Sequence, residues 1–157
     1  MMSKKELPCI GWREWVSLPD LQVKNIKVKV DTGAKTSSLH AFDLVVLREK
    51  RKYFAQFKIH PEQKSKKSTR TLYYPIVDFR KIKSSNGQSE WRPVIEANVH
   101  LGDYIWPIEI TLTNRDEMGF RMLLGRESIK DRFLVNVARS YIIGKRPVVP
   151  VKIRGGK

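Results

Sequence analysis

The candidate catalytic group in this sequence is an aspartate in the tetrapeptide Asp31-Thr32-Gly33-Ala34. The alternating apolar segment Ile26–Val30 runs directly into it, which places the carboxylate at the end of a predicted strand. Gly33 permits a tight turn, and the Thr32 hydroxyl can hydrogen-bond locally to stiffen it. A carboxylate held at a strand end can act as a general acid or base. Taken alone, the tetrapeptide is more typical of an ordinary turn closed by an Asx-type hydrogen bond.

Other catalytic and ligand-binding chemistries lack support in the sequence. The histidines His40, His60 and His100 form no paired zinc motif, and Cys9 is more typical of a small apolar residue than of a nucleophile. No Walker A loop surrounds Gly144-Lys145, and no serine lies in a nucleophile-elbow motif. We therefore expect neither a metal nor a cofactor.

A second motif lies later in the chain, where the apolar run Met122–Leu124 reaches Gly125 and a predicted short helix, Arg126–Arg132. Paired with the Asp31 tetrapeptide, it resembles the retropepsin-like aspartic peptidases. Their catalytic loop reads Asp-Thr/Ser-Gly-Ala, and a later apolar-apolar-Gly-Arg segment supports that loop. The resemblance implies that Asp31 is catalytic. It assigns support of the loop to Thr32, Gly33, Ala34, Leu124 and Gly125.

Three segments of the sequence carry a closer resemblance to one bacterial group of these peptidases. The segments are Ile10–Leu18, Lys29–Asp43 and Arg121–Ile143. These are similar to the RimB-like peptidases, which are also named ATP-dependent zinc proteases. Because the sequence offers no zinc or nucleotide motif, we favour the aspartic-peptidase part of the resemblance. Members of this group are associated with enzymes that add glutamates to the C-terminus of a ribosomal protein. The resemblance therefore suggests a glutamate-modified ribosomal protein as a substrate.

Aspartic peptidase chemistry needs two carboxylates that share one proton. The ionised carboxylate takes a proton from the attacking water, and the protonated one polarises the scissile carbonyl. This chain has one Asp-Thr-Gly motif, and 157 residues leave no room for a duplicated lobe. The resemblance thus implies an aspartic endopeptidase that acts as a homodimer, with both Asp31 side chains on a twofold axis.

The elements that must position these residues are short strands. Alternating apolar residues and turn signals predict strands over Ile10–Ser17, Ile26–Val30, Leu39–Leu47, Lys52–Ile59, Thr71–Phe79, Trp91–Val99, Trp106–Thr113 and Arg139–Ile143. With one short helix, they favour a mostly β fold, a small closed β-barrel of the retropepsin type. We expect the barrel domain over residues 10–145, an N-terminal extension over 1–9 and a basic C-terminal tail over 146–157.

Positive charge is concentrated in the middle of the chain. The net charge is +15, and residues 48–92 contribute 13 basic and 4 acidic side chains, a net of +9. Asn86-Gly87 predicts a hairpin over Phe79–Pro93, which is a candidate flap over the substrate, although an ordinary surface hairpin would show the same pattern. A basic flap would favour an acidic protein or peptide substrate. The candidate substrate-binding residues are Arg80, Lys81, Lys83 and Arg92.

A non-catalytic function is the alternative hypothesis. Aromatic residues interleaved with the basic strands, such as Tyr73 and Trp91, could stack on bases. The domain could then be a binding module for acidic protein or RNA, including one that acts on the ribosome. Such aromatics are more often core residues or cross-strand pairs. The intact Asp31 loop favours the enzyme, because a binding module has no physical need for it.

The tail and the location of the protein complete the sequence-based expectations. Apolar residues between Val148 and Ile153 form a candidate dimer-interface strand, which Pro150 would limit to an edge of a sheet. A disordered basic end is an equal alternative.

No apolar run approaches the roughly 18 to 20 residues of a membrane span. Residues 1–10 lack the apolar core of a secretory signal. We expect a soluble cytoplasmic protein with no membrane contact.

Overall fold

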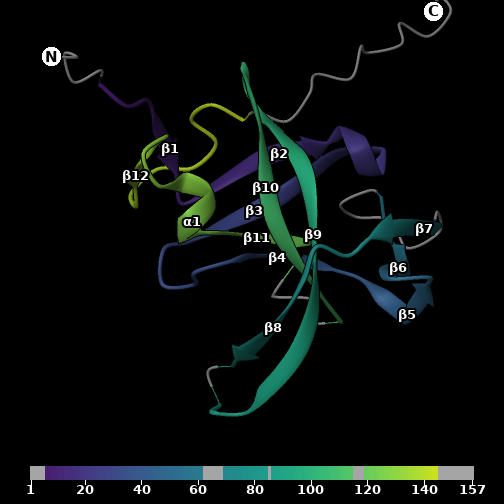
Figure 1. The fold of residues 1–157 in the computed structure, drawn as a ribbon. Coiled ribbons are helices and arrows are strands. Elements are labelled where there is room, and N and C mark those ends of the chain that lie inside the picture. The colour runs from purple at the N-terminus through teal and green to yellow at the C-terminus, as the bar shows by residue number, and fades with distance from the viewer. Residues whose placement is uncertain (1–5, 62–68, 85, 115–118, 145–157) are drawn as a thin grey trace, which may run out of the picture.

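The fold is built mainly from short strands in the computed structural model, which describes residues 6–61, 69–84, 86–114 and 119–144 (Figure 1). The predicted mostly β fold with one short α-helix is confirmed for these residues. The strands are β1 Cys9–Gly11, β2 Arg13–Leu18, β3 Val23–Asp31, β4 Ser37–His40, β5 Phe42–Glu49, β6 Lys52–Ile59, β7 Arg70–Pro75, β8 Asp78–Lys83, β9 Ser89–Leu101, β10 Tyr104–Thr113, β11 Met122–Gly125 and β12 Leu134–Asn136. The helices are the 3-10 turn η1 Pro19–Leu21 and α1 Arg126–Ile129. In this part of the chain, neither helix is long and apolar enough to cross a membrane.

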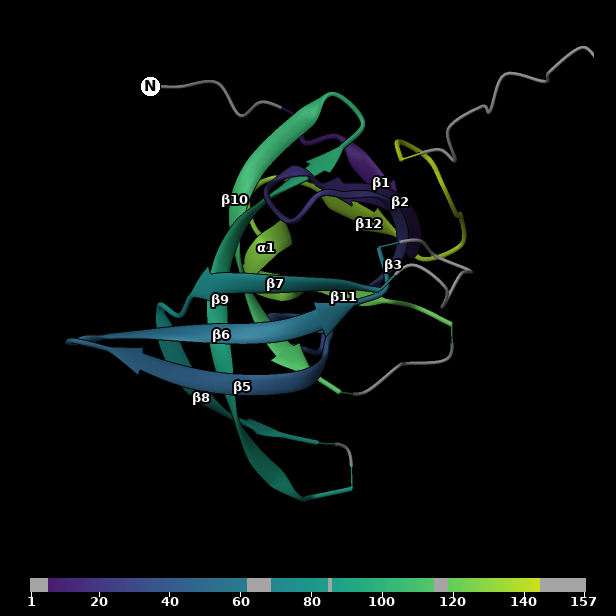
Figure 2. The ribbon, with the colours of Figure 1, turned by 90° about the vertical axis from the view of Figure 1, so that its right-hand side faces the viewer.

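A ring of hydrogen-bonded strands forms the centre of the molecule. Among the described residues its order is β10-β4-β11-β3-β2-β9, and β9 pairs with β10 to close the ring. β8 extends the ring beyond β9, and β5, β6 and β7 form a separate sheet beside it (Figure 2). The alternation in the sequence explains the core, because Ile26 and Val28 of β3 are buried whereas Lys24 is exposed.

Three of the predicted strands are each two strands in different sheets. Ile10–Ser17 is divided between β1, which pairs with β12 in a two-stranded sheet, and β2 in the ring. Leu39–Leu47 is divided between β4 in the ring and β5 in the smaller sheet; Ala41 lies at the break, and its N–H donates to the Thr113 carbonyl. Thr71–Phe79 divides between β7 and β8 after Pro75, which has no N–H to offer a ladder. Side chains alternate in both sheets, so the sequence pattern does not reveal where the chain changes sheet.

The predicted helix Arg126–Arg132 is shorter in the structure. α1 ends at Ile129, and the next residues form a turn in which the Phe133 N–H donates to the Ile129 carbonyl at 3.1 Å. Asp131 adopts a left-handed φ of +63°, a conformation that a right-handed helix cannot contain.

The predicted strand Arg139–Ile143 is wrong, because this segment is irregular and is held by the buried side chain of Glu14 in β2. The Glu14 carboxylate accepts hydrogen bonds from four backbone N–H groups: Gly11 at 2.6 Å, Gly144 at 2.7 Å, Ile142 at 3.0 Å and Ile143 at 3.2 Å. The carboxylate thus satisfies N–H groups that a strand would pair with a neighbour. It fastens residues 142–144 to the ring.

We expect Glu14→Gln to destabilise the protein by about 2–3 kcal/mol, because an amide offers a single oxygen to N–H groups that now share a carboxylate. Equilibrium urea unfolding measures the change. Glu96→Gln, at an exposed position of β9, is the matched control. A loss below about 0.5 kcal/mol, the size of an ordinary surface substitution, would show that the carboxylate does not hold this segment.

Candidate active site

Asp31 is the last residue of β3, and its carboxylate folds back over the loop that follows. Its Oδ1 atom accepts hydrogen bonds from the N–H groups of Gly33 at 3.1 Å and Ala34 at 3.2 Å. The Ala34 N–H also lies 3.2 Å from the Asp31 carbonyl oxygen. The predicted tight turn closed by the carboxylate is therefore present. Because one carboxylate oxygen is held by the backbone, the half-buried side chain has a defined orientation at the edge of the ring.

β11 supports this loop from between β3 and β4. It runs parallel to β3, with Gly125 opposite Asp31, and antiparallel to β4, with Met122 opposite Leu39. Leu124 is fully buried in the core. A segment distant in sequence therefore separates the two strands that the Asp31 loop connects.

Gly125 is the point at which β11 comes closest to the loop. A Cβ atom at this position would lie 2.6 Å from the Thr36 carbonyl carbon, so a side chain would displace the backbone. The Gly125 N–H donates to the Ser37 hydroxyl at 2.9 Å, and that hydroxyl lies 2.7 Å from the Ser128 hydroxyl. Gly125 thus lies where it can support the loop, as the motif predicts. Ser37 and Ser128 complete the contact, and sequence analysis does not find them because isolated serines carry no pattern.

The start of α1 makes further bonds to the same loop. The Arg126 N–H donates to the Ala34 carbonyl at 2.7 Å, and the Glu127 N–H donates to the Lys35 carbonyl at 3.0 Å. The Arg126 guanidinium donates to the Thr32 carbonyl at 3.1 Å. The apolar-Gly-Arg segment therefore fixes both the backbone and the direction of the loop that carries Asp31.

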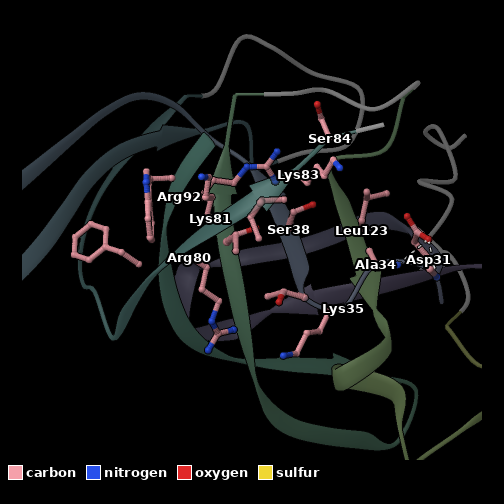
Figure 3. A pocket seen from close by; sticks show the side chains of 16 residues that line it. Asp31, Ala34, Lys35, Ser38, Arg80, Lys81, Lys83, Ser84, Arg92 and Leu123 are labelled. Atoms are coloured by element: carbon pink, nitrogen blue, oxygen red, sulfur yellow. Dashed lines mark hydrogen bonds between the residues drawn. The ribbon is translucent and has the colours of Figure 1, made fainter. Parts of the chain in front are cut away.

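A cavity of about 720 Å³ lies between the Asp31 loop and the hairpin of β8 and β9 (Figure 3). Residues 79–84, Trp91 and Arg92 form its hairpin side. Phe79 pairs with Pro93, which confirms the predicted hairpin, and Gly87 in the turn has a φ of +86°. The hairpin is thus placed where a cover over Asp31 would stand.

All four basic residues proposed from the sequence line this cavity, but they lie on two faces of the hairpin. Arg80 and Arg92 are opposite each other on the face packed toward the ring. Arg80 binds Glu109 at 2.8 Å and Asp78 at 2.9 Å. The hydrogen bond that Arg80 donates to Glu109 raises the pKa of the Arg80 guanidinium; burial lowers that pKa, and Asp78 adds to the increase. Arg80 thus ties the hairpin to β10.

The second arginine is also ion-paired. The buried Arg92 binds Glu90 at 2.6 Å. Lys81 and Lys83 lie on the opposite, exposed face of the hairpin, with Lys81 directly across from Trp91. Among the described residues neither lysine has an ion-pair partner. The arginines are therefore compensated by neighbouring acids, whereas the lysines are available to an anion.

Lys35 is a further basic residue of the cavity that sequence analysis did not single out. Among the described lining residues, Asp31 is the one carboxylate. In the same part of the chain, no three His, Cys, Asp or Glu side chains are grouped so that they could hold a metal ion. The candidate interface strand between Val148 and Ile153 lies outside the described residues.

Comparisons with known proteins place this geometry in context. The chain is similar to a crystal structure of a Legionella pneumophila protein of unknown function, with a TM-score of 0.71, 29% identity, and coverage of 88% of this chain and 99% of that one. It is 44% identical to the probable alpha-L-glutamate ligase of Shewanella pealeana over 137 residues, and 43% identical to that of Parasynechococcus marenigrum over 135 residues. These alignments cover 87% and 86% of this chain but only 30% and 29% of those relatives.

A family model described as the retropepsin-like aspartic endopeptidase RimB matches residues 9–146. The matched range contains the Asp31 loop, Gly125 and the β8–β9 hairpin. It confirms the resemblance drawn from the two sequence motifs. The chain therefore belongs to the RimB-like family of retropepsin-like aspartic endopeptidases.

Proposed function

We propose that this chain is an aspartic endopeptidase that works as a homodimer. The observation that carries the proposal is the Asp31 carboxylate, held by the Gly33 and Ala34 N–H groups beside a cavity with no second acid among its described lining residues. A second chain would supply the missing carboxylate as the Asp31 of a twofold-related copy. Two carboxylates in contact on a twofold axis would share one proton, because like charges so close together cannot both ionise.

The reaction follows from this sharing. The ionised Asp31 takes a proton from water as the water oxygen attacks the scissile carbonyl carbon, and the protonated Asp31 donates to the carbonyl oxygen. The tetrahedral intermediate then breaks its C–N bond as the nitrogen receives the proton that the first Asp31 took from water. The second Asp31 regains a proton from a hydroxyl of the intermediate, which restores the starting pair. Peptide and water become a carboxylic acid and an amine. The bonds from Gly33, Ala34 and α1 hold the carboxylate in place, which lowers the reorganisation needed during the reaction.

We propose acidic chains as substrates, including a glutamate-modified ribosomal protein. The exposed lysines Lys81 and Lys83 beside the cavity support this, since they lack acidic partners among the described residues. The relatives provide a second support, because domains similar to this chain lie within longer proteins named probable alpha-L-glutamate ligase. A peptidase of this kind would remove what such a ligase adds.

A binding module for RNA or acidic protein is the second candidate function. It is favoured by one observation: Trp91 is 68% exposed and Tyr53 is 41% exposed, with the Arg48 guanidinium 5.8 Å from the Tyr53 ring centroid. Other aromatics of the basic strands serve the fold. Phe57 is fully buried, and Phe54 stacks on Tyr73 with ring centroids 4.9 Å apart. RNA binding that is unaffected by loss of Asp31, without hydrolysis of any peptide, would favour this alternative.

The Asp31→Asn variant should lose peptidase activity by roughly 10²–10⁴-fold in kcat on a glutamate-tailed peptide, because an amide cannot share or transfer the proton. The matched control is Asp103→Asn, at an exposed turn between β9 and β10. Equal activity of Asp31→Asn and the wild type would overturn the aspartic mechanism.

Salt should weaken the capture of acidic substrates. The screening length falls from about 10 Å at 0.1 M to about 3 Å at 1 M ionic strength, which removes long-range attraction to Lys81 and Lys83. We expect KM for a glutamate-rich peptide to rise with added NaCl, while KM for a glutamine-matched peptide changes little. An equal response of both peptides would place the basic residues outside the recognition surface.

A further inference from the structure

Lys35 differs from the other cations around Asp31 because it belongs to the same rigid loop. It follows Ala34 directly, and its carbonyl oxygen accepts the Glu127 N–H at 3.0 Å. The contacts that fix Asp31 therefore also fix the backbone from which the Lys35 side chain extends. Lys81 and Lys83 lie instead on the hairpin, across the cavity from the loop.

The Lys35 side chain lies where two cavities meet. It lines the cavity of Asp31 and also a neighbouring cavity of about 460 Å³, which is bordered by Trp106, Glu109 and α1. Figure 3 shows the side chain extending from the loop toward the side of the cavity where Arg80 lies. The side chain is exposed, and within the described residues it forms no ion pair.

The acids near Lys35 leave its charge available. Glu109 is bound by Arg80 at 2.8 Å, and Glu127, which borders the second cavity, forms no ion pair with Lys35 in the described part of the chain. A substrate carboxylate placed against Arg80 or Arg92 would meet the acids that these arginines already bind. The same carboxylate placed against Lys35 would meet an ammonium with three free N–H donors.

We propose that Lys35 is a specificity-determining residue, which binds an acidic side chain of the substrate beside the scissile bond. The proposal rests on the peptidase function and deepens it, since it locates the charge selection on the candidate catalytic loop. Because Lys35 and Asp31 share one fixed backbone, the loop sets where the Lys35 side chain begins relative to Asp31, and the length of that side chain limits how far its ammonium reaches. The hairpin lysines add attraction at longer range.

Binding measured in the inactive Asp31→Asn background tests Lys35 separately from catalysis. The probes are two fluorescent peptides of equal length, one with glutamates and one with glutamines at the same positions. Their ratio of Kd values, measured by anisotropy, reports charge selection alone. We expect Lys35→Gln to reduce the preference for the glutamate peptide by roughly tenfold, the size of a lost charge-assisted hydrogen bond. Lys35→Glu should reduce it further and favour a lysine peptide.

The control is Lys52→Gln, which removes the same single charge at an exposed position of β6. A Kd ratio that is unchanged by Lys35→Gln, or changed as much by Lys52→Gln, would overturn the proposal. The peptidase function has a separate test: if the chain with Asp31 hydrolyses neither peptide while the Lys35-dependent preference persists, the peptidase proposal fails and Lys35 remains an acid-binding residue. Lys35→Gln removes the charge without introducing an acid, so it carries the test if Lys35→Glu does not fold.

Discussion

The close packing of Gly125 against the Thr36–Ser37 backbone is the constraint on which the candidate site depends. It allows β11 to lie between β3 and β4 and so to join two strands that are consecutive in the chain but not neighbours in the sheet. The same contact places the start of α1 beside Ala34 and Lys35, where its N–H groups bond to the loop. A larger residue at this position would push the loop away from β11 and move the Asp31 carboxylate with it.

The Asp31 turn was predictable because its requirements are short-range: the hydrogen bonds between Asp31 and the residues that follow it lie within four residues. The hairpin over Phe79–Pro93 was also predictable, since Asn86-Gly87 supplies the turn. Both features have a local signature in residue type. The supporting role of Gly125 was predicted only through the family resemblance, because the backbone that it contacts, at Thr36 and Ser37, is distant in the sequence.

Features set by distant contacts were not predictable from local patterns. The Arg139–Ile143 segment has the residue types of a strand, but the N–H groups of residues 142–144 donate to the buried Glu14 carboxylate and not to a neighbouring strand. A lone glutamate in an alternating strand gives no sign of these hydrogen bonds. The changes of sheet at Ala41 and Pro75 likewise depend on the partner strands. The division of basic residues follows the same rule, because Arg80 is compensated by Glu109, which is distant in sequence and adjacent in space.

The charge around the cavity is therefore organised in two layers. Arg80 ties the hairpin to β10 through Glu109, and Arg92 is paired with Glu90 within the hairpin. Lys35, Lys81 and Lys83, which form no ion pair among the described residues, line the same cavity. Net charge alone does not distinguish the paired arginines from the lysines, because the arginines and lysines of the hairpin all contribute to the +9 of residues 48–92. Lys35 lies outside that range. A binding site for acidic chains beside Asp31 is consistent with both layers.

The central claim is that one catalytic site needs Asp31 from two chains. It is tested most directly with a heterodimer of the wild-type chain and the Asp31→Asn chain, co-expressed with two different affinity tags and purified on both. Its hydrolysis of a glutamate-tailed peptide is compared with that of the doubly tagged wild-type dimer. We predict that the heterodimer has no more activity than the Asp31→Asn homodimer, because the site on its twofold axis contains one carboxylate in place of two. A heterodimer with about half of the wild-type activity would show that each chain acts alone.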